Sequence, residues 1–199
     1  YDRNNSQELI DYVVKVLDKG GVIIYPTDTM YAIGCSIQSQ QAVNRICEIK
    51  QIKPTKNRFS FICADLSSIA NFAKFSDFAF KLLKHYLPGP YTFILPGNNS
   101  LPKEFKKKTT VGIRVPDNNI IREIVRLLGN PIVSSSIHDD DDVIEYTTDP
   151  ELIYEKYADL VDIVIDAGYG GNEVSTIVDF TSGEAEIVRQ GKGDIEQYL

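Results

Sequence analysis

Residues 20–29 read GGVIIYPTDT and contain the clearest strand signal in the chain. The residues at 22–25 are β-branched or aromatic, which favours an extended strand, and the glycines in front of them end the segment that comes before. Pro26 ends the strand because it has no backbone N–H to donate. Polar residues at 27–29 follow at once. The stretch therefore predicts a short buried strand that leads directly into a polar loop.

Helical patterns lie on both sides of this strand. Ser6 precedes apolar residues with helical spacing at positions 9, 10, 13, 14 and 17, so we expect a helix capped by Ser6 that ends before the glycines. A second helix is expected from about Ser39, because apolar residues recur at positions 42, 43, 46 and 49.

The rest of the chain alternates between expected helices and strands. Further helices are predicted over 65–87, in two pieces broken near 74–76, and over 120–128 and 152–157, and further strands over 59–63, 91–95, 111–115, 131–137, 163–165, 175–180 and 185–189. Interspersed helices and strands favour an α/β fold, and no repeat or linker divides the chain. We therefore predict one domain over residues 1–199, with a twisted mixed sheet and flanking helices.

Composition excludes several classes of protein. The 199 residues are 43% hydrophobic and 25% charged, which is typical of a globular protein and unlike a disordered one. No stretch reaches the roughly 18 apolar residues of a membrane span, and the early residues lack a signal-peptide pattern, so a cytoplasmic protein is expected. Three cysteines at positions 35, 47 and 63 form no CxxC pair and are expected to be reduced core thiols. The oligomeric state stays open.

The charge balance limits the partners of the protein. With 21 Lys and Arg residues against 28 Asp and Glu residues, the formal net charge is −7. Tight, non-specific binding of nucleic acid is therefore not expected. Any contact with double-stranded RNA would be weak and local to the basic segments 50–58 or 103–108.

Three polar patches follow expected strands, at residues 27–31, 112–114 and 134–136. Ligands of open α/β sheets bind at strand ends, because the sheet holds the side chains rigidly while the loops stay accessible. The basic loop 50–58 adds positive charge nearby in sequence. These features predict a pocket for anions.

Two arginines leave an alternative open. Arg114 and Arg189 are flanked by apolar residues, where an unpaired charge is costly, so each would bind an anionic ligand or pair with an Asp or Glu across the sheet. Standard motifs do not name the ligand, since the chain has no GxxxxGK[ST] and no GxGxxG that opens a helix, and no nucleophile elbow surrounds the serines at 134–136. The acidic run at 139–142 would either gather a hard cation or form a solvated loop.

Short segments along nearly the whole chain match one known family. In chain order they are GVIIYPTDTMYAIG at 21–34, IK at 49–50, PGPYT at 88–92, VGIRVP at 111–116, PIVSSS at 131–136, STIVD at 175–179 and IVRQG at 187–191. Together they resemble the YrdC/YciO family, whose typical members are L-threonylcarbamoyladenylate synthases. Residues 91–95 and the ending GKGD at 191–194 are more similar to the YciO branch than to the main synthase branch.

The resemblance implies an α/β fold with a deep cleft and a nucleotidyltransferase activity. Its substrates would be ATP with Mg²⁺, threonine and bicarbonate, and its product threonylcarbamoyl-AMP for the modification of tRNA adenosine. Three anions must meet in this reaction, so positioned cations and backbone donors rather than a nucleophilic side chain would supply most of the acceleration. One alternative is a protein of the same fold that binds a nucleotide, an adenylate or RNA without catalysis, and another is a related acyl or carbamoyl transfer with a different substrate.

The resemblance also implies site residues. The catalytic residues would be Lys50 and Ser136. The substrate-binding residues would be Thr27, Tyr31, Lys53, Arg58, Thr92, Arg114, Ser134, His138, Ser175 and Arg189, with no metal ligand among them. Those near the threonine moiety and its carboxylate are Thr27, Tyr31, Lys50 and Arg114. Those near the carbamate and the adenylate are Thr92, Ser134, Ser136, Ser175 and Arg189.

Two motifs depart from the family pattern. Typical synthases carry Lys-x-Arg after the second helix and Ser-x-Asn after the serine strand. Here Ile52 stands at the arginine position, followed by a displaced basic residue, Lys53, and His138 stands at the asparagine position. Lysine lacks the bidentate fork of arginine, so these departures predict that ligand binding outlasts turnover.

Overall fold

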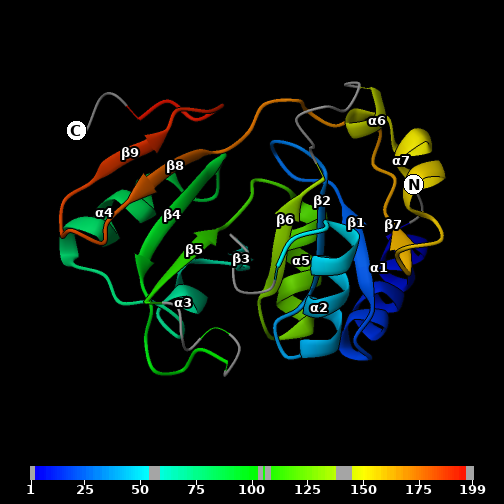
Figure 1. Cartoon of the computed structure of the whole chain (residues 1–199), viewed down its shortest axis with the longest axis horizontal. Coiled ribbons are helices and arrows are strands. Elements are labelled where there is room, and N and C mark those ends of the chain that lie inside the picture. Colours follow the sequence, from blue (N-terminus) through cyan, green and yellow to red (C-terminus); the bar gives the residue numbers. More distant parts are fainter. Residues whose placement is uncertain (1–2, 54–58, 103–104, 106–108, 138–144, 196–199) are drawn as a thin grey trace.

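The structure is a computed structural model that describes residues 3–53, 59–102, 105, 109–137 and 145–195 (Figure 1). Its elements are, in chain order, α1 (Arg3–Asp18), β1 (Val22–Tyr25), β2 (Ala32–Ser36), α2 (Gln40–Ile49), β3 (Ser60–Ile62), α3 (Leu66–Ile69), α4 (Asp77–Tyr86), β4 (Tyr91–Pro96), β5 (Thr110–Arg114), α5 (Asn119–Leu128), β6 (Ile132–Ser136), α6 (Glu145–Thr148), α7 (Pro150–Tyr157), β7 (Ile163–Val164), β8 (Thr176–Asp179) and β9 (Glu186–Arg189).

The strands form one nine-stranded sheet in the order β7-β1-β2-β6-β3-β5-β4-β8-β9. Three strand pairs are parallel, namely β1 with β7, β3 with β5 and β4 with β8, and the other pairs are antiparallel. The predicted α/β fold with a mixed sheet and flanking helices is therefore confirmed.

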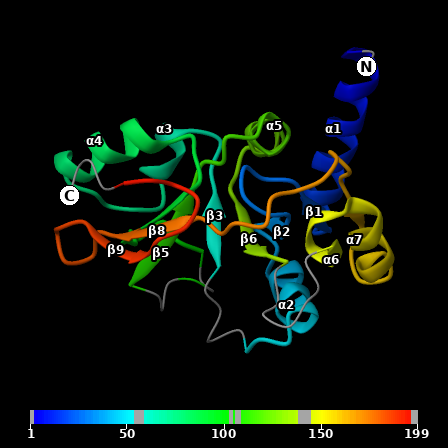
Figure 2. The ribbon, with the colours of Figure 1, turned by 90° about the horizontal axis from the view of Figure 1, so that it is seen from above.

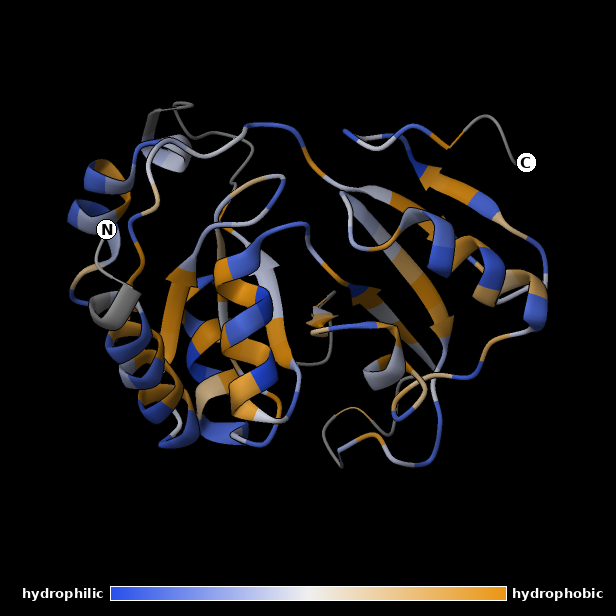
Figure 3. Ribbon diagram, turned by 180° about the vertical axis from the view of Figure 1, so that it is seen from behind, coloured by the Kyte–Doolittle hydropathy of each residue, from blue (hydrophilic) through white to orange (hydrophobic). Residues whose placement is uncertain are grey.

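Helices cover both faces of the first half of the sheet, with α1 and α5 on one side and α2 on the other (Figure 2). Alternate residues of β1 enter different apolar clusters, because successive side chains of a strand point to opposite faces. Ile23 packs with Leu17 of α1 and Ile124 of α5, whereas Ile24 belongs to the cluster that contains Ile46 of α2. Figure 3 shows the helices striped with hydrophobic and hydrophilic residues, as expected of helices that pack on a sheet with one face.

Helix ends follow the expected capping chemistry in most cases. The side chains of Ser39, Ser76 and Asn118 each accept a hydrogen bond from a backbone N–H in the first turn of α2, α4 and α5. The expectation that Ser6 caps the first helix is wrong, because α1 already begins at Arg3. The helix extends through Asn4 and Asn5 in spite of their modest helix propensity, so Ser6 lies inside it.

Strand β2 is an element for which the sequence interpretation made no prediction. It pairs with β1 in an antiparallel hairpin whose connection is the polar loop after Tyr25. Its residues are buried on both faces and small or apolar on both, so they show no alternation of polar and apolar residues. The hairpin places this loop at the end of two strands.

Burial of the three cysteines agrees with the prediction of core thiols, since Cys35, Cys47 and Cys63 are free and buried. Burial raises the pKa values of the Cys35 and Cys63 thiols to about 12, which disfavours the reactive thiolate. Among the helices of the described residues, none combines the length and the apolar character that crossing a membrane requires.

Candidate functional site

A cleft of about 560 Å³ opens on the sheet where α5 stops covering it. Ile62 and Ile132 pair across β3 and β6 and pack in the apolar cluster with α5. Two residues further along the same face, Ser60 pairs with Ser134 on one side and with Gly112 on the other. The face therefore changes from large apolar side chains to glycine and serine within one step, and this change creates the cleft floor.

The polar loop after β1 forms one wall of the cleft. Thr29 and Met30 line it, and Thr27 holds the loop by donating a hydrogen bond to the Met30 carbonyl oxygen at 2.6 Å and accepting one from the Thr29 N–H at 3.1 Å. Thr27 is thus a residue that shapes the wall without lining the cleft.

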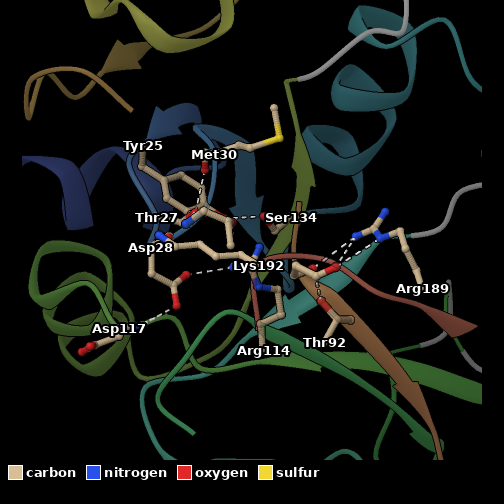
Figure 4. Close-up of polar contacts among 12 residues, drawn as sticks. Tyr25, Thr27, Asp28, Met30, Thr92, Arg114, Asp117, Ser134, Arg189 and Lys192 are labelled. Carbon is tan, nitrogen blue, oxygen red and sulfur yellow. Dashed lines mark hydrogen bonds and ion pairs between the residues drawn. The ribbon is translucent and has the colours of Figure 1, made fainter. Parts of the chain in front are cut away.

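Arg114 is anchored to this wall by Asp28 (Figure 4). Its Nη2 donates to Asp28 Oδ1 at 2.9 Å and to Thr29 Oγ1 at 3.0 Å. Asp28 Oδ2 accepts a hydrogen bond from the Asp117 N–H at 3.0 Å, and the Asp28 carbonyl oxygen accepts one from Lys192 Nζ at 2.6 Å. The sequence left open whether Arg114 pairs with an Asp or Glu or binds an anionic ligand, and the structure shows that it pairs with Asp28.

The pairing leaves part of the Arg114 guanidinium unused. Burial lowers the pKa of Arg114 and the negative charge of Asp28 opposes that shift, so the side chain stays cationic. Within the described residues, Arg114 Nε is buried without a hydrogen-bond partner, and Arg114 lines the cleft. Nη1 is not among these buried atoms and has no hydrogen bond within the described residues, so the guanidinium keeps a donor for an anion.

Arg189 lies on the opposite wall with Thr92 and Ser175. Its Nη2 and Nε donate to the Ser175 carbonyl oxygen at 2.8 and 3.1 Å, and the hydroxyls of Ser175 and Thr92 are 2.9 Å apart. The part of the chain that the structure describes offers Arg189 no ion pair with a carboxylate. Burial and the nearby charge of Arg114 lower the pKa of Arg189, so two cations share one cleft.

The serine strand β6 forms the third part of the site. Ser134 and Ser136 line the cleft, and the Ser134 hydroxyl is hydrogen-bonded to the buried hydroxyl of Tyr25. Lys50 follows α2 as its C-terminal cap, and its Nζ donates to the Ser136 carbonyl oxygen at 3.1 Å. Lys50 therefore borders the cleft through Ser136.

The structure brings half of the twelve expected site residues together in the cleft. Six of them line the cleft, namely Thr92, Arg114, Ser134, Ser136, Ser175 and Arg189. Lys53 is exposed and is not among the lining residues. Arg58 and His138 lie outside the described residues, as do the acidic run at 139–142 and much of both basic segments. The roles implied for all of these residues stay predictions.

Tyr31 is not among the residues that line the cleft, and its expected contact with substrate stays a prediction. Its side chain is buried, and its hydroxyl donates to the Gly168 carbonyl oxygen at 2.8 Å and accepts from the Ala167 N–H at 3.1 Å. The hydroxyl therefore binds the segment between β7 and β8 and not the cleft.

Sequence reasoning gave no role to Asp28, Lys192, Tyr25 and Ser60. Asp28 and Lys192 lie inside segments that match the family, and this position was a signal that they belong to the site. Their contacts could not be read from the sequence, because Asp28 is 86 positions from Arg114 and 164 positions from Lys192. Ser60 carried no signal beyond its place in an expected strand.

A resident metal ion does not fit the described residues. No group of three or more His, Cys, Asp or Glu side chains among them is arranged to hold one. Both carboxylate oxygens of Asp28, the acidic residue bound to Arg114 in the wall, already accept hydrogen bonds.

The chain is similar to proteins of a known family. Residues 15–191 match the Sua5/YciO/YrdC family model, which is described as "Telomere recombination". The YciO protein of Escherichia coli strain K12 is 39% identical over 199 residues, which cover 98% of this chain and 95% of that protein. The crystal structure of E. coli YciO matches with a TM-score of 0.88 over 97% of this chain and 94% of that chain.

Relatives with lower identity carry functional names. The threonylcarbamoyl-AMP synthase of Klebsiella pneumoniae is 27% identical over 194 residues, which cover 96% of this chain and 100% of that protein. The crystal structure of P. abyssi Sua5 complexed with L-threonine is 25% identical, with a TM-score of 0.84, over 94% of this chain and 55% of that chain. The higher identity to YciO confirms the predicted similarity to the YciO branch.

Proposed function

The chain belongs to the Sua5/YciO/YrdC family, and from this premise we propose that it forms threonylcarbamoyl-AMP and pyrophosphate from ATP, L-threonine and bicarbonate. The product would serve the threonylcarbamoyl modification of tRNA adenosine. The name of the Klebsiella relative and the threonine in the P. abyssi complex support this choice of substrates.

One observation carries the proposal. The cleft combines two arginines from opposite walls with the hydroxyls of Thr92, Ser134 and Ser175, over a floor of small residues. This arrangement suits a reaction in which several anions must be held close together.

The reaction needs positioning more than side-chain nucleophiles. The deprotonated amine of threonine bonds to the carbon of bicarbonate, and water leaves to give an N-carboxylate. An oxygen of this carboxylate then bonds to the α-phosphorus of ATP, and the bond from that phosphorus to the pyrophosphate oxygen breaks. Mg²⁺ would enter as a complex with ATP and offset part of the triphosphate charge.

We assign the two walls to different substrates. Arg114, fixed through Nη2 by Asp28 and Thr29, has donors left for the carboxylate of threonine. Arg189 and Ser175 lie on the other wall and would meet the phosphate of the nucleotide. Repulsion between the bound anions is thereby offset from two sides.

A second candidate function is binding without turnover. Ile52, which stands where typical synthases carry arginine, is half-buried and packs against the apolar core. The side chain at this position therefore adds no cation to the cleft. A protein that binds the nucleotide or the adenylate but reacts slowly, or not at all, fits this substitution.

Measurement of pyrophosphate release decides between the two functions. We expect release that requires both threonine and bicarbonate, and calorimetric binding of Mg-ATP that is weakened by about 2 kcal/mol in Arg189→Ala. The matched control is Arg126→Ala, which removes an exposed arginine paired with Glu123 and should leave both readouts unchanged. Binding of ATP and threonine without any threonine-dependent release would favour the second candidate. Absence of binding to either ligand would contradict both.

A further inference from the structure

Tyr25 reaches the cleft floor from the side, along the same face of the sheet, although it does not line the cleft. Its side chain is fully buried, and within the described residues its hydroxyl has a single hydrogen-bond partner, the Oγ of Ser134. Ser134 is only 3% exposed, and it lines the cleft. A buried phenol therefore contacts a hydroxyl that faces the ligand space.

Gly34 makes this contact possible. Tyr25 is on β1 and Ser134 on β6, with β2 between them, and Gly34 of β2 pairs directly with Ser134. A Cβ atom at position 34 would lie 3.0 Å from Cε1 of the Tyr25 ring. The ring therefore extends over the glycine, and only the missing side chain lets it span one whole strand.

The two hydroxyl protons have only one consistent arrangement. Each hydroxyl carries one proton, and the described surroundings of the Tyr25 hydroxyl provide one acceptor, Ser134 Oγ. If Ser134 donated to Tyr25, the phenol proton would be buried without an acceptor, which is unfavourable. Tyr25 therefore donates and Ser134 accepts. No other acceptor for the Ser134 proton lies among the described residues, so this proton is left to point into the cleft.

Burial keeps the phenol in the donating form. It raises the pKa of Tyr25 well above its ordinary value, with the hydrogen bond between Tyr25 and Ser134 and the charge of Arg114 acting in the opposite direction. Burial therefore favours the protonated phenol, which is the form that can donate to Ser134.

We propose that Tyr25 is a positioning residue that holds the Ser134 hydroxyl as a hydrogen-bond donor aimed at an anionic oxygen of the bound ligand. This inference rests on the proposed function, because the cleft must hold an anion. The oxygen belongs either to the phosphates of ATP or to the carboxylate of threonine. Preorientation matters, since a hydroxyl that is already turned toward the ligand loses no rotational freedom on binding.

A double-mutant cycle tests the inference on the full chain. The variants are Tyr25→Phe, which keeps the ring and removes one oxygen, Ser134→Ala, and the two combined. Binding of Mg-ATP and of L-threonine is measured separately by calorimetry. We expect Ser134→Ala to weaken binding of one ligand about tenfold, Tyr25→Phe to weaken it about three- to tenfold, and the double variant to bind like Ser134→Ala.

The matched control is Tyr91→Phe. It removes the hydroxyl of another buried tyrosine, which donates to the Asp194 carbonyl oxygen at 2.8 Å and does not face the cleft. Binding by this control should equal that of the parent protein. The ligand whose affinity falls in Tyr25→Phe and Ser134→Ala, ATP or threonine, is the one whose oxygen accepts the hydrogen bond from Ser134.

Three results would overturn the inference. Tyr25→Phe could bind both ligands like the parent protein, or its effect could add in full to that of Ser134→Ala. If Tyr25→Phe alone does not fold, the double variant still tests the inference, because binding weaker than that of Ser134→Ala would mean that Tyr25 acts on the ligand by a route other than Ser134. If the parent protein binds neither ligand, the proposed function is contradicted as well. If the parent protein binds and Tyr25→Phe does not change its affinity, only the role of Tyr25 is contradicted.

Discussion

Replacement of Arg114 by methionine should separate the structural role of this arginine from its role in binding. Arg114 and Asp28 form an ion pair at 2.9 Å, with side-chain exposures of only 11% and 9%. Arg114→Met keeps most of the aliphatic stem but leaves the Asp28 carboxylate buried without its cation. Removal of one partner from such a pair typically costs about 3–5 kcal/mol, which for a chain of this size corresponds to a fall in Tm of roughly 6–20 °C.

The double variant Asp28→Ala/Arg114→Met should recover much of this loss. With both charges gone, no uncompensated carboxylate remains, so the coupling between the two sites in the free energy of unfolding should be at least about 2 kcal/mol. Urea unfolding measures this coupling. Threonine affinity, measured by calorimetry, should stay low in both variants because the proposed carboxylate contact is absent from both.

Two results would refute this reasoning. A loss below about 1 kcal/mol in Arg114→Met would mean that the pair behaves like a solvated surface pair. Recovery of threonine affinity in the double variant would mean that Arg114 does not contact the ligand. Arg126→Met is the matched control, because Arg126 pairs with Glu123 on the exposed side of α5 and should change neither quantity.

Three further predictions concern the rate, the cleft floor and RNA. The family motifs can be restored by Ile52→Arg with deletion of Lys53 and by Ile137→Ala with His138→Asn. Restoration should raise the threonine-dependent rate of pyrophosphate release by on the order of a hundredfold per restored contact. A restored variant that binds ATP but releases no pyrophosphate would argue for a different acceptor. Gly112→Val should weaken ATP binding at unchanged Tm, because a Cβ there meets Thr92 and Ser60 at ordinary distances of 3.5–3.7 Å while the added methyl groups enter the cleft. Double-stranded RNA should bind weakly in shift assays at two salt concentrations, and tight binding with a salt slope of about six or more would contradict the effect expected from the net charge of −7.

Local patterns were sufficient for the elements that carry strong local signals. The β-branched run before Pro26 predicted β1 at its observed bounds, and Ser39 was correctly expected at the start of α2. Strand β2 was not predicted, because Gly34 and Cys35 are both buried and the strand lacks the alternation of polar and apolar residues that identifies a strand. Strand β1 is buried on both faces as well, but its β-branched run identified it.

The candidate site could be predicted in composition but not in its internal contacts. Polar residues on or next to strands, such as Ser134 within β6 and Ser175 just before β8, gather in one cleft because the strands belong to one sheet. The partner of Arg114 could not be chosen from the pattern, since Asp28 is 86 positions away and its choice depends on the pairing of strands. The partner of the Tyr31 hydroxyl could not be chosen either, since Gly168 is 137 positions away.

The small residues of the sheet connect the fold to the proposed chemistry. Gly34, Ser134, Ser60 and Gly112 occupy paired positions on β2, β6, β3 and β5, and thus form one row across the sheet. On the α5 side of this row the face is filled by Ile62 and Ile132, which stabilise the packing of the helix. A row of larger apolar residues at these positions would bury more surface but would leave no floor for a ligand. The sheet therefore gives up apolar burial along this row, and in return it supplies a rigid surface on which the two arginine-bearing walls can hold their ligands.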